Sequence, residues 1–325
     1  MSVSEIDLGN VRVYGCGGCG INIAKNYLGY KTAVGYSHIH PAFIDTSKSN
    51  LKNIDSNNPI FVLEGTDGSG KVRAENADAI NKNIKKILVD IPPMDFNIVV
   101  FSGSGGSGSV AASLLVAELA SRHIPVIAIV VGSEESVITC NNTVKTLKSL
   151  DSLARQKQVP ITMFYEYNTQ TTKRSEVDAS VFRTIGNLAL LTSKQNSELD
   201  SKDIENWVFF DKTTPVEPCL AYLDIKSNSE VVKQIPTPIS IASLYRNPDQ
   251  PMIDVQPDYQ CTGYTENFVG EIDQTHFIIE LDSVGEIYKA IEKRLSAMEE
   301  LRNSRVINSS LTDANDKTDD SGLIL

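Results

Sequence analysis

Short apolar runs alternate with stretches of helical periodicity through the first half of the chain. The apolar runs are typical of buried strands and occur at residues 11–14, 42–44, 60–63, 97–101, 125–131 and 161–167. Segments with apolar residues at every third or fourth position lie between them, at residues 80–89, 110–123 and 143–157. This alternation across residues 10–170 predicts a doubly wound α/β domain with a mostly parallel sheet. His38 and His40 flank a predicted turn before the second strand, and we interpret them as surface residues.

The second half of the chain follows a different pattern. Apolar residues recur at helical intervals from about residue 174 to residue 196, which predicts one long helix. Strands separated by Pro, Asn and Asp turns are predicted at residues 207–210, 219–225, 238–244 and 276–281. They indicate a smaller mixed domain with a mostly antiparallel sheet. An apolar stripe then predicts a last helix at residues 283–305.

Residues 306–325 differ from the rest of the chain in composition. They are mostly Asn, Ser, Thr and Asp, and they end in the aliphatic residues Leu323, Ile324 and Leu325. Such a segment cannot bury a core of its own and is expected to be disordered when free. An acidic segment that ends in aliphatic residues also has the chemistry of a docking peptide for a basic groove.

A run of glycine and serine, Ser102 to Ser109, connects the fourth predicted strand to a helix. Strand, small-residue loop and helix is the arrangement that aims backbone N–H groups and the positive end of a helix dipole at an anion. Glycine allows close approach of a phosphate, and serine adds hydroxyl donors. We therefore predict a phosphate-binding loop here rather than a flexible linker.

Two further glycine-rich loops follow strands, at residues 15–20 and 65–72. The first matches G-x-G-x-x-G, which on its own suggests a dinucleotide fold with Asp45 at a ribose. The second nearly matches the Walker A motif, but Val72 stands where a Ser or Thr would hold magnesium. We interpret it as another nucleotide-facing loop, because the segment after it is too polar for the buried helix of a true P-loop.

Composition and charge narrow the function classes. A hydrophobic content of 41% and a charged content of 22% are those of a globular protein, and 325 residues leave room for two cores. The net charge of −11 argues against direct nucleic-acid binding and against binding to anionic membranes, since both require clustered Lys and Arg. No apolar run of about 18 residues occurs, so neither membrane insertion nor a signal peptide is expected.

The five cysteines fit a reducing cytoplasm better than a disulfide framework. Cys16 and Cys19 lie in the first glycine-rich loop with the C-x-x-C spacing used for zinc binding or thiol redox chemistry. No second Cys pair or nearby His completes a zinc ligand set, so we rank the metal interpretation below the phosphate one.

The order of these motifs resembles that of the tubulin/FtsZ superfamily. A G-x-G-G-x-G-x-N loop follows the first strand, a G-G-S-G-S loop follows the fourth, and a long helix leads to a D-x-x-D sequence at Asp200 and Asp203. The short length and the acidic tail are similar to those of the phage-encoded tubulins, the PhuZ group. The resemblance implies a nucleotide-binding domain at residues 1–173, a central helix at 174–199, an activation domain at 200–282, a C-terminal helix at 283–305 and an acidic tail at 306–325.

The resemblance also implies a GTPase that binds GTP or GDP, with Mg²⁺ held mainly through phosphates and water. The nucleotide contacts that it implies lie in the strand-following loops and at the start of the central helix. They are Gly15, Cys16, Gly17, Gly18, Cys19, Gly20, Asn22, Asp45, Thr46, Gly65, Asp67, Gly68, Gly103, Ser104, Gly105, Gly106, Ser107, Gly108, Ser109, Glu134, Asn168 and Asp178. Ser104 replaces a glycine of the family pattern, and Cys19 interrupts the first loop. An acid at Asp178 favours guanine, because a carboxylate accepts from N1–H and N2–H₂.

Asp200 and Asp203 are implied to be the catalytic pair. Their carboxylates, one helical turn apart, could orient the attacking water. The resemblance implies that they complete the nucleotide site of the adjacent subunit, so that hydrolysis requires head-to-tail polymerisation of the chain with itself. Without the resemblance, two acids in the first turn of a helix need no catalytic explanation.

The resemblance further implies a spindle-like role in the cytoplasm of an infected bacterium, with phage DNA, its compartment or capsids as cargo. An NAD(P)-dependent oxidoreductase of the Rossmann type is the alternative, but it leaves residues 102–109 without a role. A third possibility is a non-enzymatic scaffold that binds nucleotide only structurally.

Overall fold

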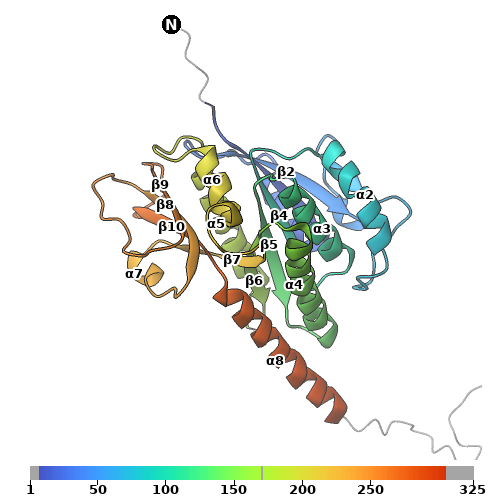
Figure 1. Ribbon diagram of the computed structural model, residues 1–325. Helices are drawn as coiled ribbons and strands as arrows, with labels where there is room; N and C mark the ends of the chain where they lie inside the picture. The colour runs from blue at the N-terminus through green and yellow to red at the C-terminus, as the bar shows by residue number, and fades with distance from the viewer. Residues whose placement is uncertain (1–6, 170, 305–325) are drawn as a thin grey trace, which may run out of the picture.

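One continuous sheet forms the centre of the molecule. The computed structural model describes residues 7–169 and 171–304 (Figure 1). The ten strands in this part of the chain follow the order β3-β2-β1-β4-β5-β6-β7-β10-β8-β9. Their bounds are β1 Asn10–Cys16, β2 His38–Asp45, β3 Ile60–Val62, β4 Phe96–Ser102, β5 Val126–Ser133, β6 Ile161–Asn168, β7 Leu220–Lys226, β8 Pro238–Tyr245, β9 Tyr259–Tyr264 and β10 Gln274–Glu280.

Parallel pairing runs from β3 through to β7. Strand β10 is antiparallel to β7 and to β8, and β9 is parallel to β8. The strands of the second half therefore extend the first sheet through the β6–β7 pair. Every residue of β5 is buried, as expected for a strand covered on both faces.

Helices cover the sheet. Their bounds are α1 Gly17–Ala24, α2 Ala77–Asp90, α3 Ser107–Ser121, α4 Val137–Lys157, α5 Arg174–Leu191, α6 Ser201–Val208, α7 Ser229–Val232 and α8 Asp282–Ser304, with 3₁₀ turns η1 Lys25–Tyr27, η2 Ser49–Leu51 and η3 Phe210–Lys212. Helices α2, α3, α4 and α8 lie side by side in that order, and α8 runs along α4 and away from the body (Figure 1). Helix α5 contacts β6 and α1.

The strand order reverses at β1, which pairs with β2 on one side and β4 on the other. In doubly wound sheets, ligands bind outside the carboxyl ends of the strands at this reversal. The loops that leave β1 and β4 are two of the predicted glycine-rich loops, at residues 15–20 and 102–109. The fold therefore brings them together at the position where a ligand is expected.

The predicted fold class is confirmed, whereas the predicted end of the long helix is wrong. Helix α5 ends at Leu191 instead of continuing to residue 196 or 199. Thr192 Oγ1 donates to Leu188 O at 2.8 Å, and Asn196 Nδ2 donates to Leu190 O and Leu191 O at 2.9 Å. These side chains satisfy the last carbonyls of the helix, and the chain then turns through Lys194 at φ +60°.

The strand predicted at residues 207–210 is also wrong, because this segment ends α6 and continues into η3. Its run of aromatic and β-branched residues is typical of a strand, but Ile204, Trp207 and Val208 share one buried helical face. The buried Trp207 donates from Nε1 to Phe277 O at 3.1 Å, which fixes α6 against β10. Strand β9 was not predicted, since its polar residues and Gly263 obscure the strand pattern.

The turn predicted at His38 and His40 is wrong as well. Both residues lie in β2, opposite Asn10 and Arg12 of β1. His38 is exposed, and the half-buried His40 bonds through Nε2 to Asn10 Oδ1 at 2.9 Å. Hydrogen bonding to β1 thus extends the strand beyond its apolar run.

Candidate functional site

Two adjoining hollows open at the carboxyl ends of the parallel strands. The glycine-loop cavity, about 250 Å³, is lined by Cys16, Gly17, Gly18, Cys19, Asp45, Thr46, Gly68, Ser69, Gly70, Lys71, Ser102, Gly105, Gly106, Ser107, Gly108 and Ser109. The polar cavity, about 270 Å³, is lined by Cys19, Asn22, Lys71, Ser102, Ser104, Val131, Ser133, Glu135, Thr139, Asn168, Arg174 and Asp178. They share Cys19, Lys71 and Ser102, so together they form one elongated site.

Close packing of glycines shapes the glycine-loop cavity. A Cβ on Gly108 would lie 3.0 Å from Gly17 Cα, and a Cβ on Gly106 would lie 2.0 Å from Ser69 Oγ. Helix α3 begins at Ser107, so the N–H groups of its first turn have no acceptor within the helix and lie at this cavity. The Ser107 N–H donates to Ser69 Oγ at 2.9 Å. The site is therefore a small-residue cradle of the kind that binds phosphate.

The loop at residues 65–71 packs over the start of α3. Asn76 Nδ2 donates to Gly68 O at 2.7 Å and to Ser107 Oγ at 2.9 Å. Asn142 Nδ2 donates to Lys71 O at 2.9 Å. The next helix begins only at Ala77, so no helix N-terminus follows Lys71 directly as it would in a Walker A loop.

Unpartnered polar atoms face both hollows. The hydroxyl of Thr46 and the Oδ1 atom of Asn168 are buried, and neither has a hydrogen-bond partner among the described residues. Burial raises the pKa of the Asp178 carboxyl, and Arg174 opposes this rise. Buried polar atoms are normally paired, so the Thr46 hydroxyl and Asn168 Oδ1 are suited to contact a polar ligand.

Most of the predicted nucleotide contacts line this site. Six do not, and their surroundings explain why. Gly15 and Gly20 pack behind the cavity, where a Cβ on Gly20 would lie 2.0 Å from Val100 O. Gly103 packs against Val130 and Thr143. Gly65 and Asp67 lie outside the lining, and Asp67 accepts from Ser47 Oγ at 2.7 Å.

The sixth is Glu134, whose Oε2 atom lies 3.7 Å from Arg294 Nε of α8. Its neighbour Glu135 lines the polar cavity instead and pairs with Arg174 at 3.1 Å. Sequence reasoning missed Glu135 and Arg174 as lining residues, whereas Ser69 and Lys71 belong to the predicted nucleotide-facing loop at residues 65–72. When two acids are adjacent in a loop, the sequence alone does not indicate which of them faces the site.

The cysteines at the site do not have the properties of a metal or redox pair. Burial raises the pKa of the Cys16 thiol, and it raises the pKa of Cys19 to about 12. Both are therefore protonated at neutral pH, whereas metal binding and nucleophilic attack need the thiolate. Within residues 7–169 and 171–304, no group of three or more His, Cys, Asp or Glu could hold a metal ion.

The predicted catalytic pair lies at the other end of the parallel strands, near their amino ends. Asp200 caps α6, accepting from the N–H groups of Lys202 and Asp203 at 2.7 and 2.9 Å. Asp203 accepts from Asp200 N at 3.0 Å and from Tyr259 Oη at 3.3 Å. Helix α6 lies at the end of the molecule where the described residues begin (Figure 1). The acids are therefore remote from the glycine loops of their own chain.

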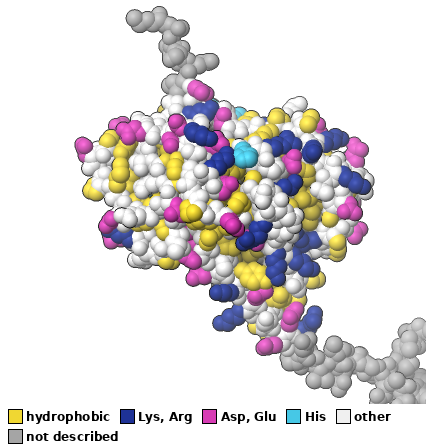
Figure 2. All heavy atoms as spheres, in the orientation of Figure 1, with side chains coloured by type: hydrophobic (Ala, Val, Ile, Leu, Met, Phe, Trp, Pro, Cys, Tyr) yellow, Lys and Arg dark blue, Asp and Glu magenta, His cyan; other side chains and the backbone are white. Residues whose placement is uncertain are grey.

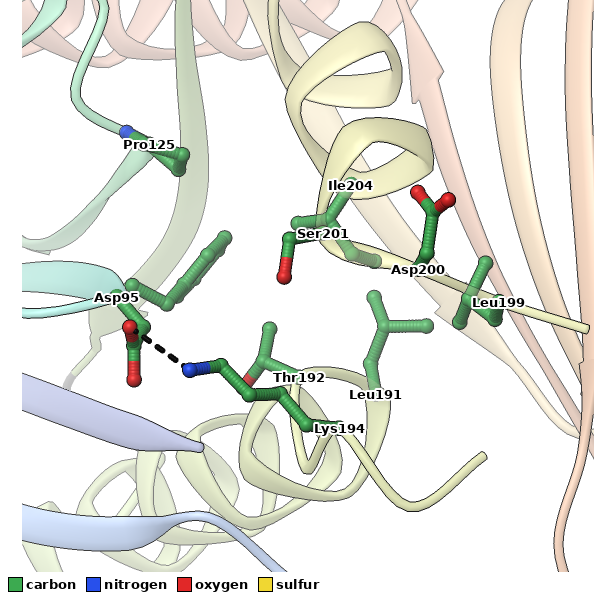
Figure 3. A pocket seen from close by; sticks show the side chains of 10 residues that line it. Asp95, Pro125, Leu191, Thr192, Lys194, Leu199, Asp200, Ser201 and Ile204 are labelled. Atoms are coloured by element: carbon green, nitrogen blue, oxygen red, sulfur yellow. Dashed lines mark ion pairs between the residues drawn. The ribbon is translucent and has the colours of Figure 1, made fainter. Parts of the chain in front are cut away.

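A third hollow adjoins Asp200, and we call it the amino-end cavity. It measures about 240 Å³ and is lined by Asp95, Phe96, Pro125, Leu191, Thr192, Lys194, Leu199, Asp200, Ser201 and Ile204 (Figure 3). Phe96 begins β4 and Pro125 directly precedes β5, which fixes this cavity at the amino ends of these strands. An ion pair of 3.0 Å between Lys194 and Asp95 borders it.

Among the described residues, no helix combines the length and the apolar character needed to span a membrane.

Comparisons with known protein families match both halves of the chain. The Tubulin/FtsZ family GTPase domain matches residues 10–159. The C-terminal domain of phage tubulin-like proteins matches residues 199–285. The phage tubulin-like protein of Pseudomonas phage phiKZ is 30% identical, with 96% of this chain and 97% of that protein covered.

Solved structures agree with these matches. A protofilament of TubZ from bacteriophage PhiKZ has a TM-score of 0.85 at 29% identity, covering 97% of this chain and 99% of that one. The phage tubulin PhuZ in its GDP form also has a TM-score of 0.85, at 28% identity and the same coverage. The predicted resemblance is thereby confirmed.

Proposed function

This chain belongs to the phage tubulin-like proteins of the tubulin/FtsZ family, and we propose that it binds and hydrolyses GTP while polymerising head to tail. The solved relatives include a protofilament and a GDP complex, which supports both parts of the proposal. The alternative of a dinucleotide-dependent oxidoreductase is not supported by the family, and the scaffold hypothesis requires an inactive site.

The two hollows suit the two ends of a nucleotide. The N–H groups of α3 and the glycine cradle fit the phosphates, whereas the polar cavity fits the ribose and base. Asn168 and Asp178 supply an amide and a carboxylate for the edge of guanine. Glu135 is the acid that we assign to the ribose, in place of Glu134.

Magnesium fits this site only as an ion carried by the nucleotide. Asp45 and the unpartnered Thr46 hydroxyl are oxygen donors in the glycine-loop cavity. Asp45 already accepts from Thr46 N at 2.7 Å and from Asn50 Nδ2 at 2.8 Å. Bound magnesium supplies charge neutralisation on the phosphates, and water completes its coordination.

One observation carries the proposal of a shared site. The glycine loops lie at the carboxyl ends of β1 and β4, whereas Asp200 adjoins the amino ends of β4 and β5. A single chain cannot bring these groups together, but head-to-tail stacking sets one chain's acids beside the next chain's nucleotide. Such an interface is heterologous and extends without limit, as a filament requires.

Phosphoryl transfer depends on positioning and on charge neutralisation more than on a strong base. The Asp200 and Asp203 carboxylates would hold the attacking water in line with the γ-phosphate. Each also caps α6, so the helix fixes the position of the pair before the subunits meet. Hydrolysis would then follow assembly.

We assign the protein a cytoskeletal role in the cytoplasm of the infected bacterium, with phage DNA, its compartment or capsids as cargo. The phage origin of the relatives supports this assignment. This role is tested by fluorescence microscopy of infected cells that carry a tagged copy, in which the polymer should move together with the cargo.

The acidic tail at residues 306–325 lies outside the described residues, and we propose that it docks on a neighbouring subunit. A groove of about 560 Å³ between α2, α3 and α4 has two cations in its lining, Arg73 and Lys148, and one acid, Asp78. Arg73 donates to the hydroxyls of Ser109, Thr146 and Ser149. Lys and Arg side chains gather over these helices on the face in Figure 2, which suits an acidic peptide.

Removal of residues 306–325 is expected to raise the critical concentration for assembly by about tenfold or more, since each subunit loses one contact. GTP affinity below that concentration should stay unchanged. Sedimentation and nucleotide titration measure the two quantities. Replacement of Asp313, Asp316, Asp319 and Asp320 by Asn should have a smaller effect of the same sign, and unaltered assembly of the truncated chain would contradict tail docking.

The proposed function is tested by GTP turnover per molecule as a function of protein concentration, with light scattering in parallel. We expect turnover near zero below a critical concentration and a rise together with scattering above it, because the site is complete only between subunits. Concentration-independent turnover would exclude a shared site. Absence of GTP binding would refute the proposal as a whole.

A further inference from the structure

The amino-end cavity has an apolar interior and a charged border. Phe96, Leu191, Leu199 and Ile204 contribute buried apolar surface, whereas Lys194 and Asp200 are exposed. In Figure 3 the apolar side chains surround the hollow, with the Lys194–Asp95 ion pair on one side and Asp200 on the other. A hollow of this kind takes an aliphatic side chain flanked by charge.

An aliphatic side chain of this description protrudes from the opposite end of the molecule. Val72 is 53% exposed, directly after Lys71 of the glycine-loop cavity. Hydrogen bonds hold the backbone around it, since Val72 N donates to Ser69 O at 2.7 Å and Lys71 O accepts from Asn142. Arg73 is fixed by three hydroxyls on the other side. The loop therefore presents Val72 on an anchored turn.

The cavity and the valine lie at opposite ends of the same strand. Strand β4 begins at Phe96, in the cavity, and ends at Ser102, in the lining of the nucleotide site. Lys71 lies against Gly106 of the loop that follows β4, with its Cα 3.1 Å from a Cβ built there. Stacking of subunits along the strand direction would therefore bring the end of one subunit that carries Val72 toward the end of the next that carries the amino-end cavity.

The charges that flank the two features are complementary. Lys71 precedes Val72, and Asp200 borders the cavity, with Asp203 one turn further along α6. Two other exposed apolar residues, Ile138 and Tyr167, lie near the nucleotide site, but Ile138 is in the first turn of α4 and Tyr167 is near the carboxyl end of β6. They are displaced from the line of β4 and lack a basic neighbour in sequence.

We propose that Val72 of one subunit inserts into the amino-end cavity of the next and sets the register of the longitudinal contact. This inference rests on the proposed head-to-tail assembly. The seated valine would align Asp200 and Asp203 with the γ-phosphate, because Lys71 and the phosphate cradle belong to the same packed unit. A change in the loop at residues 65–71 on nucleotide binding would thus move Val72 and alter the longitudinal contact.

Paired cysteines test the contact. The variant Val72→Cys/Ser201→Cys is assembled with GTP, oxidised mildly and run on a non-reducing gel. A ladder of cross-linked oligomers is expected, because Ser201 borders the cavity. The matched control is Val89→Cys/Ser201→Cys. Val89 is also exposed (77%), but it lies at the end of α2, on the same end of the subunit as the amino-end cavity, so it should not meet Ser201 of the next subunit. Polymer without a ladder, or an equal ladder from the control, would overturn the inference.

Charge insertion gives a second readout. Val72→Asp is expected to raise the critical concentration by about tenfold or more, because a carboxylate would enter an apolar hollow beside Asp200. Val89→Asp should change it less than twofold, and GTP affinity of the unassembled subunits should be the same for both variants. Normal assembly of Val72→Asp would refute the valine contact alone. Failure of the unaltered protein to assemble would refute the proposed function itself.

Discussion

Replacement of Asp203 by asparagine is expected to lower GTP turnover in the polymer by a factor of about 10² or more, the usual scale for loss of a group that positions and polarises water. Filaments should form at the same protein concentration and persist longer, because hydrolysis no longer weakens them. Asparagine keeps one oxygen that can accept from Asp200 N, as Oδ2 of Asp203 does, so α6 keeps its cap. Its NH₂ group, in the place of Oδ1, can donate to Tyr259 Oη. Phosphate release and light scattering measure the two effects separately.

Mixing of two impaired variants distinguishes a shared site from an internal one. Asp203→Asn has a complete nucleotide site, whereas Asp178→Ala loses a carboxylate of the polar cavity and keeps the acidic pair. At a GTP concentration too low to occupy Asp178→Ala, each variant alone should be nearly inactive. Their mixture should regain turnover, since Asp178→Ala subunits supply Asp203 to nucleotide bound by their neighbours. Additive activities in the mixture would contradict catalysis across the interface.

Substitution of Gly20 by alanine is expected to destabilise the fold by about 2 kcal/mol or more, the scale of a forced overlap in a packed interior. The added Cβ would lie 2.0 Å from Val100 O and 2.9 Å from Val100 C, which are backbone atoms of β4. A flexible side chain could move aside, but a strand in the middle of the sheet cannot. Chemical denaturation at constant ligand concentration measures the change.

Gly186 provides the matched control. It lies within α5, and a Cβ built there has no neighbouring atom within 4 Å. Alanine at this position should stabilise the protein by about 0.5–1 kcal/mol, because alanine restricts the unfolded chain and favours helix. A Gly20→Ala variant as stable as the unaltered protein would show that helix α1 can shift away from β4.

Most of the α/β architecture was predictable because the apolar runs are long and the helices between them are amphipathic. The apolar runs of β5 and β6, for example, identify these segments as buried strands without information from the rest of the chain. The errors arose where a distant part of the chain decides the outcome. Trp207 is helical because its indole reaches Phe277, and α5 stops at Leu191 because Asn196 folds back on it. Neither contact produces a hydrophobic periodicity that could be recognised in the sequence.

The site was predictable only in part for a related reason. Glycine-rich loops after strands predict a phosphate site, but the same pattern includes glycines that serve packing, such as Gly15 and Gly20. Glu134 and Glu135 differ only in direction, and Arg294 of α8 contacts the former. The separation of Asp203 from the glycine loops depends on strand direction, which becomes clear only once the sheet is assembled.

The two edge strands of the sheet, β3 and β9, affect which lateral contacts neighbouring filaments can make. Strand β3 has only three residues and follows Pro59, which has no N–H to offer. At the other margin, Tyr264 of β9 exchanges two backbone hydrogen bonds of 3.0 Å with Ser197. Ordered stacking would otherwise align many exposed edges in one row, a geometry that promotes amyloid-like pairing. A short strand at one margin and a paired residue at the other limit sheet-to-sheet pairing, so we expect any lateral contact between filaments to be made by side chains and to weaken with salt.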